Sequence, residues 1–188
     1  MPREDVPHPE WWQAPDEQAT ETEVSELVGA MVTALQPRFV LETGSYHGHT
    51  TLEIARALQR NGHGRLVSLE HSAPRAALAK KRLSHLPSEF YEILTVSSMD
   101  YTPDALIDFA WLDSDGGDMR YKEFKRFLPW FHRSTIVGIH DTQPGRDERG
   151  GVNLLERDGL FRPVHLPTPR GVTFGNVVTN TKRWAAVE

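Results

Sequence analysis

The sequence of 188 residues contains no cysteine and no uninterrupted apolar stretch long enough to cross a membrane. The absence of cysteine excludes a disulfide scaffold, a thiol nucleophile and a cysteine-ligated zinc site, and it fits a cytoplasmic protein. The first residues, Met1–Asp5, lack the basic and then apolar pattern of a secretory signal. We therefore expect no export and no membrane partner.

The sequence also has little excess of basic charge. Its formal net charge is −5, and residues 1–26 hold eight acidic side chains against one basic side chain, which leaves +2 for the rest. Nucleic-acid-binding domains usually carry a basic face, so we expect no nucleic-acid partner. The length predicts about one domain. We predict an acidic irregular N-terminal arm over 1–19, with Trp11 and Trp12 docked on the body or over a pocket, and a single domain over 20–188.

Beyond the arm, short apolar runs alternate with segments of helical periodicity. Helices are predicted at 20–35, 50–59, 74–83, 121–131 and 152–157, with a further helical turn within 103–107. Strands are predicted at 39–41, 66–69, 90–96, 109–112, 135–139, 161–166 and 172–178, and a glycine-rich loop is predicted at 145–151. This alternation is typical of an α/β fold with a parallel sheet. The last two strands have no helix between them, so they should pair antiparallel at one edge.

Ligands of open parallel sheets bind at the carboxyl ends of the strands, so the residues that follow each strand are the candidates for chemistry. The first strand leads into Glu42-Thr43-Gly44-Ser45-Tyr46-His47-Gly48. The glycines let a ligand approach the backbone, and the leading carboxylate disfavours a pyrophosphate and favours a cationic ligand. Glu70 ends the second strand, at a spacing where an acid commonly binds ribose hydroxyls. The alternatives are a plain strand-to-helix turn and a solvated acid.

Two further strands deliver carboxylates to the same rim. Asp113 follows the fourth strand and Asp141 follows the fifth. Clustered carboxylates repel one another unless a cation neutralises them, and Mg²⁺ suits such an oxygen-rich site. Alternatively, Asp113 accepts hydrogen bonds from the backbone or a ligand amine, and Asp141 caps a turn. His140 is either a base that works at neutral pH or a packed strand histidine.

Taken in order, these segments resemble a known family. Residues 40–51 resemble motif I of class I S-adenosylmethionine-dependent methyltransferases, in the form found in small-molecule O-methyltransferases related to the catechol and caffeoyl-CoA enzymes. Residues 108–115, 139–142 and 167–171 are similar to a bacterial subgroup with D-G-D-H-x-Y after the fourth strand and H-D-T after the fifth. The resemblance covers about 22–178. It implies a Rossmann-like methyltransferase sheet of seven strands, mostly parallel with an antiparallel last strand, and helices on both faces.

The resemblance also implies roles for individual residues. Those around the methionine part of S-adenosylmethionine would be Glu42, Gly44, Ser45, Tyr46, Gly48 and Thr50. Those around its adenosine part would be Glu70, His71, Ser98 and Met99. Asp113 would lie near both the methionine amine and a metal ion, with Asp141 and Thr142 as further metal ligands. The predicted catalytic residues are Asp113 and His140, with His140 as the base.

The loop after the fourth strand departs from the pattern of the subgroup. Gly116-Gly117 stands in place of the histidine, Tyr121 comes late, and the lysine base of the catechol-type enzymes has no counterpart. The sequence therefore leaves open both the base and the need for Mg²⁺. We predict S-adenosylmethionine-dependent methyl transfer to an oxygen of a small-molecule acceptor. The alternatives are a non-catalytic binding or regulatory protein on the same fold and an NAD-dependent oxidoreductase. The family often forms dimers, which makes a homodimer a candidate assembly.

Overall fold

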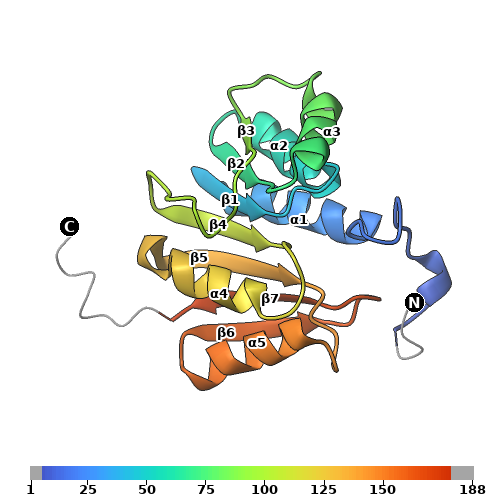
Figure 1. Cartoon of the computed structure of the whole chain (residues 1–188), viewed down its shortest axis with the longest axis vertical. Helices are drawn as coiled ribbons and strands as arrows, with labels where there is room; N and C mark the ends of the chain where they lie inside the picture. The colour runs from blue at the N-terminus through green and yellow to red at the C-terminus, as the bar shows by residue number, and fades with distance from the viewer. Residues whose placement is uncertain (1–5, 179–188) are drawn as a thin grey trace.

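The computed structural model describes residues 6–178, which form one seven-stranded sheet with helices on both faces (Figure 1). The strands lie in the order β3-β2-β1-β4-β5-β7-β6. Their bounds are β1 Phe39–Thr43, β2 Arg65–Leu69, β3 Tyr91–Leu94, β4 Ile107–Leu112, β5 Phe131–His140, β6 Phe161–Leu166 and β7 Val172–Val177. β7 runs antiparallel to both β5 and β6, and the other neighbouring pairs are parallel. The predicted α/β class, the parallel sheet and the antiparallel pair at one edge are confirmed.

Three helices cover one face of the sheet and two cover the other. α1 (Thr22–Leu35) and α2 (His49–Asn61) pack on the first face, and α3 (Ala73–Leu83) packs beside α2 against β3. α4 (Met119–Phe127) and α5 (Asp147–Arg157) cover the opposite face, which is the nearer one in Figure 1. Among the described helices, none has both the length and the apolar character needed to cross a bilayer.

The central strands are buried on both faces. All five residues of β1 are buried, and its side chains alternate between the layers, with Val40 facing α1 and α2 and Leu41 facing α4 and α5. Gly138 on β5 leaves room for large rings, because a Cβ atom there would lie 2.6 Å from Trp111 and 2.7 Å from Phe174. This close packing holds the carboxyl ends of β4 and β5 side by side.

Two predictions about irregular segments are wrong. The segment 145–151 is not a loop throughout, because α5 already begins at Asp147. An acid in the first helical turn is favoured by the helix dipole, which here outweighs the local glycines. The segment 103–107 forms no helix in the described chain, and it leads directly into β4 at Ile107.

The junction between α4 and β5 also differs from the sequence-based prediction. The helix predicted over 121–131 ends at Phe127, because Pro129 lacks the backbone N–H that a longer α-helix needs. A 3-10 turn follows, and β5 begins at Phe131 rather than at 135. Phe131 pairs in register with Ile107 of β4, so the neighbouring strand extends β5 toward its N-terminus.

The described part of the N-terminal arm lies beyond the start of α1, and its last residues reach the carboxyl edge of the sheet (Figure 1). It contains one 3-10 turn, η1 (Pro9–Trp11), before α1. Trp12 packs against the core formed by α1, α2 and the sheet, as predicted for the tryptophan pair. Trp11 is 67% exposed and stacks on His8, so the prediction is wrong for this residue. Thr20 is buried at the end of the arm, which makes this segment part of the site described next.

Candidate active site

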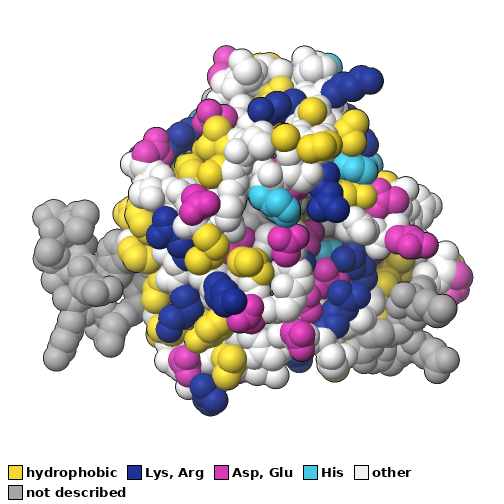
Figure 2. All heavy atoms as spheres, viewed as in Figure 1, with side chains coloured by type: hydrophobic (Ala, Val, Ile, Leu, Met, Phe, Trp, Pro, Cys, Tyr) yellow, Lys and Arg dark blue, Asp and Glu magenta, His cyan; other side chains and the backbone are white. Residues whose placement is uncertain are grey.

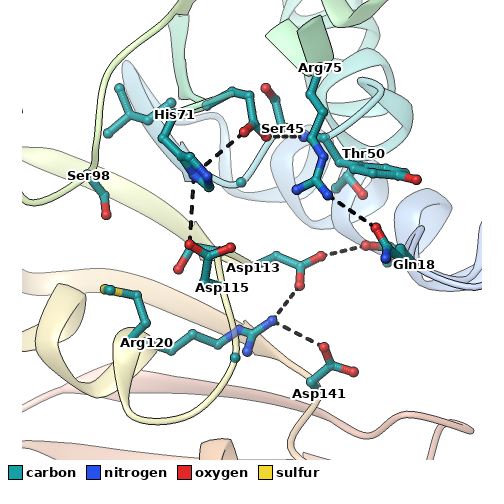
Figure 3. A pocket seen from close by; sticks show the side chains of 18 of the residues that line it. Gln18, Ser45, Thr50, His71, Arg75, Ser98, Asp113, Asp115, Arg120 and Asp141 are labelled. Atoms are coloured by element: carbon teal, nitrogen blue, oxygen red, sulfur yellow. Dashed lines mark hydrogen bonds and ion pairs between the residues drawn. The ribbon is translucent and has the colours of Figure 1, made fainter. Parts of the chain in front are cut away.

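A cavity of about 610 Å³ opens at the carboxyl ends of β1, β2, β4 and β5 (Figure 3). Acidic, basic and histidine side chains gather around this hollow on the face shown in Figure 2. Predicted residues that line it are Gly44, Ser45, Tyr46, Thr50, Glu70, His71, Ser98, Asp113 and Asp141. Predicted residues outside its lining are Glu42, Gly48, Met99, His140 and Thr142.

The turn between β1 and α2 forms one wall of the cavity. Gly44 has a φ of 79°, and a Cβ atom there would lie 2.2 Å from the backbone oxygen of Asp113, so only glycine fits. Tyr46 has a φ of 47°, which non-glycine residues seldom adopt. Its ring stacks on His47 at 3.7 Å, and the guanidinium of Arg75 lies 5.0 Å from its centre. The turn is therefore held in a strained shape by its surroundings.

Glu70, directly after β2, presents a carboxylate to the cavity. The residue is only 3% exposed, and the backbone N–H groups of Tyr46 and Ser72 each donate to the carboxylate at 2.9 Å. These bonds fix the carboxylate and leave lone pairs for the hydroxyl groups of a ligand. The next side chain, His71, lies with its Nδ1 3.8 Å from Oδ2 of Asp115 (Figure 3). This pair joins the ends of β2 and β4.

Glu42 lies beneath the cavity rather than in its wall. It is fully buried, and its Oε2 accepts hydrogen bonds from the hydroxyl of Ser68 and, at 2.7 Å, from that of Thr51. Burial raises the pKa of Glu42 to about 7, because the loss of hydration outweighs the two hydrogen bonds. The position of this carboxylate does not support the predicted direct contact with a bound ligand.

Of the other predicted cofactor residues, some line the cavity and others only pack against neighbouring elements. Gly48 is required by packing, because a Cβ atom there would lie 2.9 Å from the backbone of α3. Met99 is 37% exposed and lies outside the cavity, whereas Ser98 lines it. The hydroxyl of Ser45 is buried in the wall and has no hydrogen-bond partner among the described residues, whereas the hydroxyl of Ser114 lies beside the buried carboxylate of Glu123. Buried hydroxyls are normally hydrogen-bonded, so the hydroxyl of Ser45 is consistent with a ligand that has polar groups.

His140, the predicted base, is enclosed between two carboxylates. It ends β5 and is fully buried, with Nδ1 3.1 Å from Oδ1 of Asp113 and Nε2 2.7 Å from Oε2 of Glu21. Burial alone lowers the pKa of His140, but the charge of Asp113 and the hydrogen bonds to both carboxylates outweigh it and raise the pKa to about 9. At neutral pH the ring is therefore a cation that donates from both nitrogens. Enclosed in this way and outside the cavity lining, the ring does not support the predicted role of His140 as the base.

Asp113 and Asp141 bind cationic side chains (Figure 3). Oδ1 of Asp113 accepts from Nη2 of Arg120 at 2.9 Å, and Oδ2 accepts from the hydroxyl of Thr20 at 2.6 Å. Asp141 accepts from Nε and Nη2 of Arg170, both at 2.7 Å, and from Nη2 of Arg120 at 3.1 Å. Burial by itself raises the pKa of Asp113, but the nearby positive charges hold it well below its usual range. The carboxylate is therefore ionised.

This arrangement does not fit a divalent metal ion. The structure does bring Asp113, His140 and Asp141 together, with one potential ligand atom from each within 4.8 Å of the others. Each of the four carboxylate oxygens, however, already accepts from a side-chain donor of the protein. The hydroxyl of Thr142, the predicted third ligand, lies 2.8 Å from Oγ1 of Thr173. The predicted metal site is thus neutralised by the chain itself.

The sequence analysis missed the cationic side of the site. Arg120 in α4, Arg146 before α5, and Arg170 in the turn before β7 all line the cavity. The negative charge at the ends of β4 and β5 was the one signal that pointed to nearby cations. These arginines follow the carboxylates by intervals that match no short motif, so the sequence alone favours a metal ion over side-chain cations at this rim.

Comparison with known proteins connects this cavity to a family. A family model described as a methyltransferase domain matches residues 41–142, which is more than half of the chain. The matched segment begins in β1 and ends just after β5, so it contains the turn at Gly44, the carboxylate of Glu70 and the Asp113–Asp141 pair.

Curated relatives match a shorter stretch. A transmembrane O-methyltransferase from Homo sapiens is 38% identical over 80 residues, which is 42% of this chain and 27% of that protein. A catechol O-methyltransferase from Niastella koreensis is 33% identical over 88 residues, which is 43% of this chain and 38% of that protein. The chain thus spans between about a quarter and two fifths of the length of the curated relatives that it matches.

Solved structures share the fold over most of the chain. The O-methyltransferase TomG from Streptomyces achromogenes, in complex with SAM, has a TM-score of 0.70 at 20% identity, with 88% of this chain and 83% of that one covered. An O-methyltransferase from Bacillus cereus, in complex with SAH, has a TM-score of 0.72 at 18% identity, with 87% and 84% covered. At these identities the likeness establishes the fold alone. The family model, in contrast, matches more than half of the sequence, and the chain therefore belongs to this methyltransferase domain family.

Proposed function

We propose that this protein transfers the methyl group of S-adenosylmethionine to an oxygen atom of a small-molecule acceptor. The cavity carries the proposal, since it combines the glycine turn, the fixed carboxylate of Glu70 and the unpartnered hydroxyl of Ser45. Relatives named as O-methyltransferases support oxygen as the acceptor atom, and neighbours in complex with SAM or SAH support the cofactor.

The cavity wall offers a place for each part of this cofactor. Glu70 would accept hydrogen bonds from the ribose hydroxyls, with His71 and Ser98 beside the adenine. The turn over 44–50 would border the methionine part. Asp113 presents an ionised carboxylate at this end of the cavity, where it would accept a hydrogen bond from the ammonium of the ligand.

The bound cofactor supplies a methyl group that its sulfonium makes electrophilic. The task of the chain is to align the acceptor oxygen and to keep water out, with Met119, Arg146 and Glu148 along the far end of the cavity. Oε1 of Glu148 is held by Nη1 of Arg120 at 3.1 Å and by the backbone N–H of Gly117 at 3.2 Å. No donor in the described chain is bonded to Oε2, so we assign this oxygen as the acceptor of the proton that the hydroxyl group loses.

Calorimetric titration of the purified protein with S-adenosylmethionine tests the cofactor. We expect micromolar binding, and we expect Glu70→Gln to weaken it at least about tenfold, because charged hydrogen bonds to the ribose are lost. Glu92→Gln, at an exposed acid on β3, is the matched control and should bind as the wild type does. No binding by the wild type would refute the cofactor and favour a non-catalytic protein, and binding of NADH instead would favour an oxidoreductase.

Transfer itself is measured with labelled S-adenosylmethionine and with catechol as a probe acceptor, in the presence and absence of EDTA. We expect labelled product in both conditions. Glu148→Gln should lower kcat by about 10²–10⁴-fold, the range for loss of a general base, while cofactor affinity stays unchanged. A Glu148→Gln variant with wild-type kcat would refute this carboxylate as the base.

The proposed assembly is a homodimer, as the family resemblance implies. Light scattering of the purified protein measures its mass directly. Twice the chain mass of 21.3 kDa supports the dimer, and a single chain mass refutes it. A cytoplasmic location and a bacterial source remain predictions from the cysteine-free sequence and from the resemblance to a bacterial subgroup.

A further inference from the structure

We propose that the guanidinium of Arg120 is the built-in cation of this site and excludes a divalent metal ion from Asp113 and Asp141. The inference deepens the proposed function and rests on it only for the assignment of the cavity to methyl transfer. It concerns a residue in the first turn of α4 that has no role in the sequence-based prediction.

Arg120 lies at the centre of three carboxylates that come from three elements. Its Nη2 is 2.9 Å from Asp113 after β4 and 3.1 Å from Asp141 after β5, and its Nη1 is 3.1 Å from Glu148 in α5. The side chain is 3% exposed. A cation surrounded by carboxylate oxygens from several strand ends is the arrangement that a Mg²⁺ ion would need. The guanidinium therefore occupies the position of such an ion and supplies a positive charge there.

The loop after β4 is shaped to hold this arginine. Gly117 has a φ of 74°, and its backbone N–H donates to the same Oε1 of Glu148 that binds Arg120. At Gly116, a Cβ atom would lie 3.1 Å from that oxygen. The two glycines thus let the loop close over Glu148 and fix the third carboxylate against Arg120. The two glycines that replace the histidine of the bacterial subgroup therefore allow the contact between Glu148 and Arg120.

A metal ion could bind Asp113 and Asp141 only by displacing the arginine side chains that already neutralise these carboxylates. Arg170 binds both oxygens of Asp141 at 2.7 Å, and Arg146 lies 3.2 Å from one of them. Removal of Arg120 from its partners would leave a buried guanidinium without hydrogen bonds, beside an incoming divalent cation. Both effects oppose metal binding. Since Arg120 also lines the cavity, its positive charge lies beside the acceptor end without any metal.

Titration with Mn²⁺ alone tests the proposal on the protein without cofactor, after chelator treatment and dialysis. We expect no binding by the wild type up to several millimolar. Arg170 would still bind both oxygens of Asp141 after loss of Arg120 alone, so the test variant is Arg120→Met/Arg170→Met, which removes both guanidinium groups and keeps most of the side-chain volume. It should bind Mn²⁺ with a Kd of about 1 mM or tighter, as weak carboxylate sites do. Arg120→Lys keeps a positive charge and should not bind. Adding Asp141→Asn to the double variant should abolish the new binding.

Two results would overturn the proposal. One is wild-type binding of Mn²⁺ that disappears in Asp141→Asn, and this result needs no Arg120 variant to fold. The other is an Arg120→Met/Arg170→Met protein with a cooperative thermal transition and no Mn²⁺ binding. Titration of the same wild-type sample with S-adenosylmethionine is a separate measurement. Its failure would refute the proposed function and leave the Mn²⁺ result standing.

Discussion

The buried charge of His140 makes a quantitative prediction about stability. The ring is fully enclosed and donates to Glu21 and Asp113, and its pKa is raised from an ordinary 6.5 to about 9. Because the folded pKa lies above the unfolded one, the folded protein binds an extra proton. This stabilisation is fully present below pH 6.5 and is lost as the pH rises through 9.

The magnitude follows from the size of the pKa difference. At about 1.4 kcal/mol for each pH unit, the protonated ring contributes about 3 kcal/mol to the free energy of unfolding. For a chain of 150–250 residues this corresponds to a loss of about 6–12 °C in Tm between pH 6.5 and 9.5. His140→Gln removes this titration. The variant also leaves the carboxylates of Glu21 and Asp113 without their cation, so it should be less stable than the wild type at pH 6.5.

Urea unfolding, followed by tryptophan fluorescence at several values between pH 6.5 and 9.5, measures this effect. The stability difference between wild type and His140→Gln should shrink by about 3 kcal/mol over this range. His85→Gln, at an exposed histidine, is the control and should follow the wild type. Parallel pH profiles for the wild type and His140→Gln would refute the buried imidazolium and return His140 to the candidate bases.

Three further predictions concern other parts of the site. The raised pKa of Glu42 favours its protonated form in the folded protein, so the wild type should lose about 3 kcal/mol of unfolding free energy as the pH rises from 4.5 through 7. Glu42→Gln should not show this loss. The same pH profile of urea unfolding in both proteins contradicts the prediction. Gly44→Ala should lower the free energy of unfolding by more than about 3 kcal/mol, since its Cβ meets the backbone of Asp113. Gly62→Ala, at similar φ and in open space, should lower it by about 1 kcal/mol. Equal losses in urea unfolding contradict this prediction. Arg170→Met should release the N-terminal segment, so that limited proteolysis cleaves it faster than in the wild type.

Local features of the sequence predicted the sheet and the turn that begins the cavity. Strands such as β1 consist of apolar residues bounded by turn residues, so their position depends on neighbours within a few residues. Gly44 was likewise predictable, because a glycine after a buried strand and before a helix is a local signal. Glu70 was predictable for the same reason, as an acid at the end of the next strand.

The charge states of the buried side chains in the site could not be predicted from local features of the sequence. His140 is a fixed cation because Glu21, 119 residues earlier in the chain, accepts from its Nε2. Arg170 binds Asp141 across 29 residues and Arg120 reaches it across 21, and no local pattern marks either pair. Side-chain charge in a buried cluster depends on contacts that only the folded chain creates, so the sequence could place the carboxylates without naming the cations that neutralise them.

The anchoring of the N-terminal segment also has a consequence for the order of folding during synthesis. Glu21 binds His140, which is synthesised 119 residues later. The backbone oxygen of Gln18 accepts from Arg170, which follows it by 152 residues. At about 5–20 residues per second, the ribosome needs about 10–30 s to supply these partners. During this time the first residues of the cavity have no counterpart. The side of the cavity that the N-terminal segment forms is therefore completed last, when nearly all of the described residues have emerged.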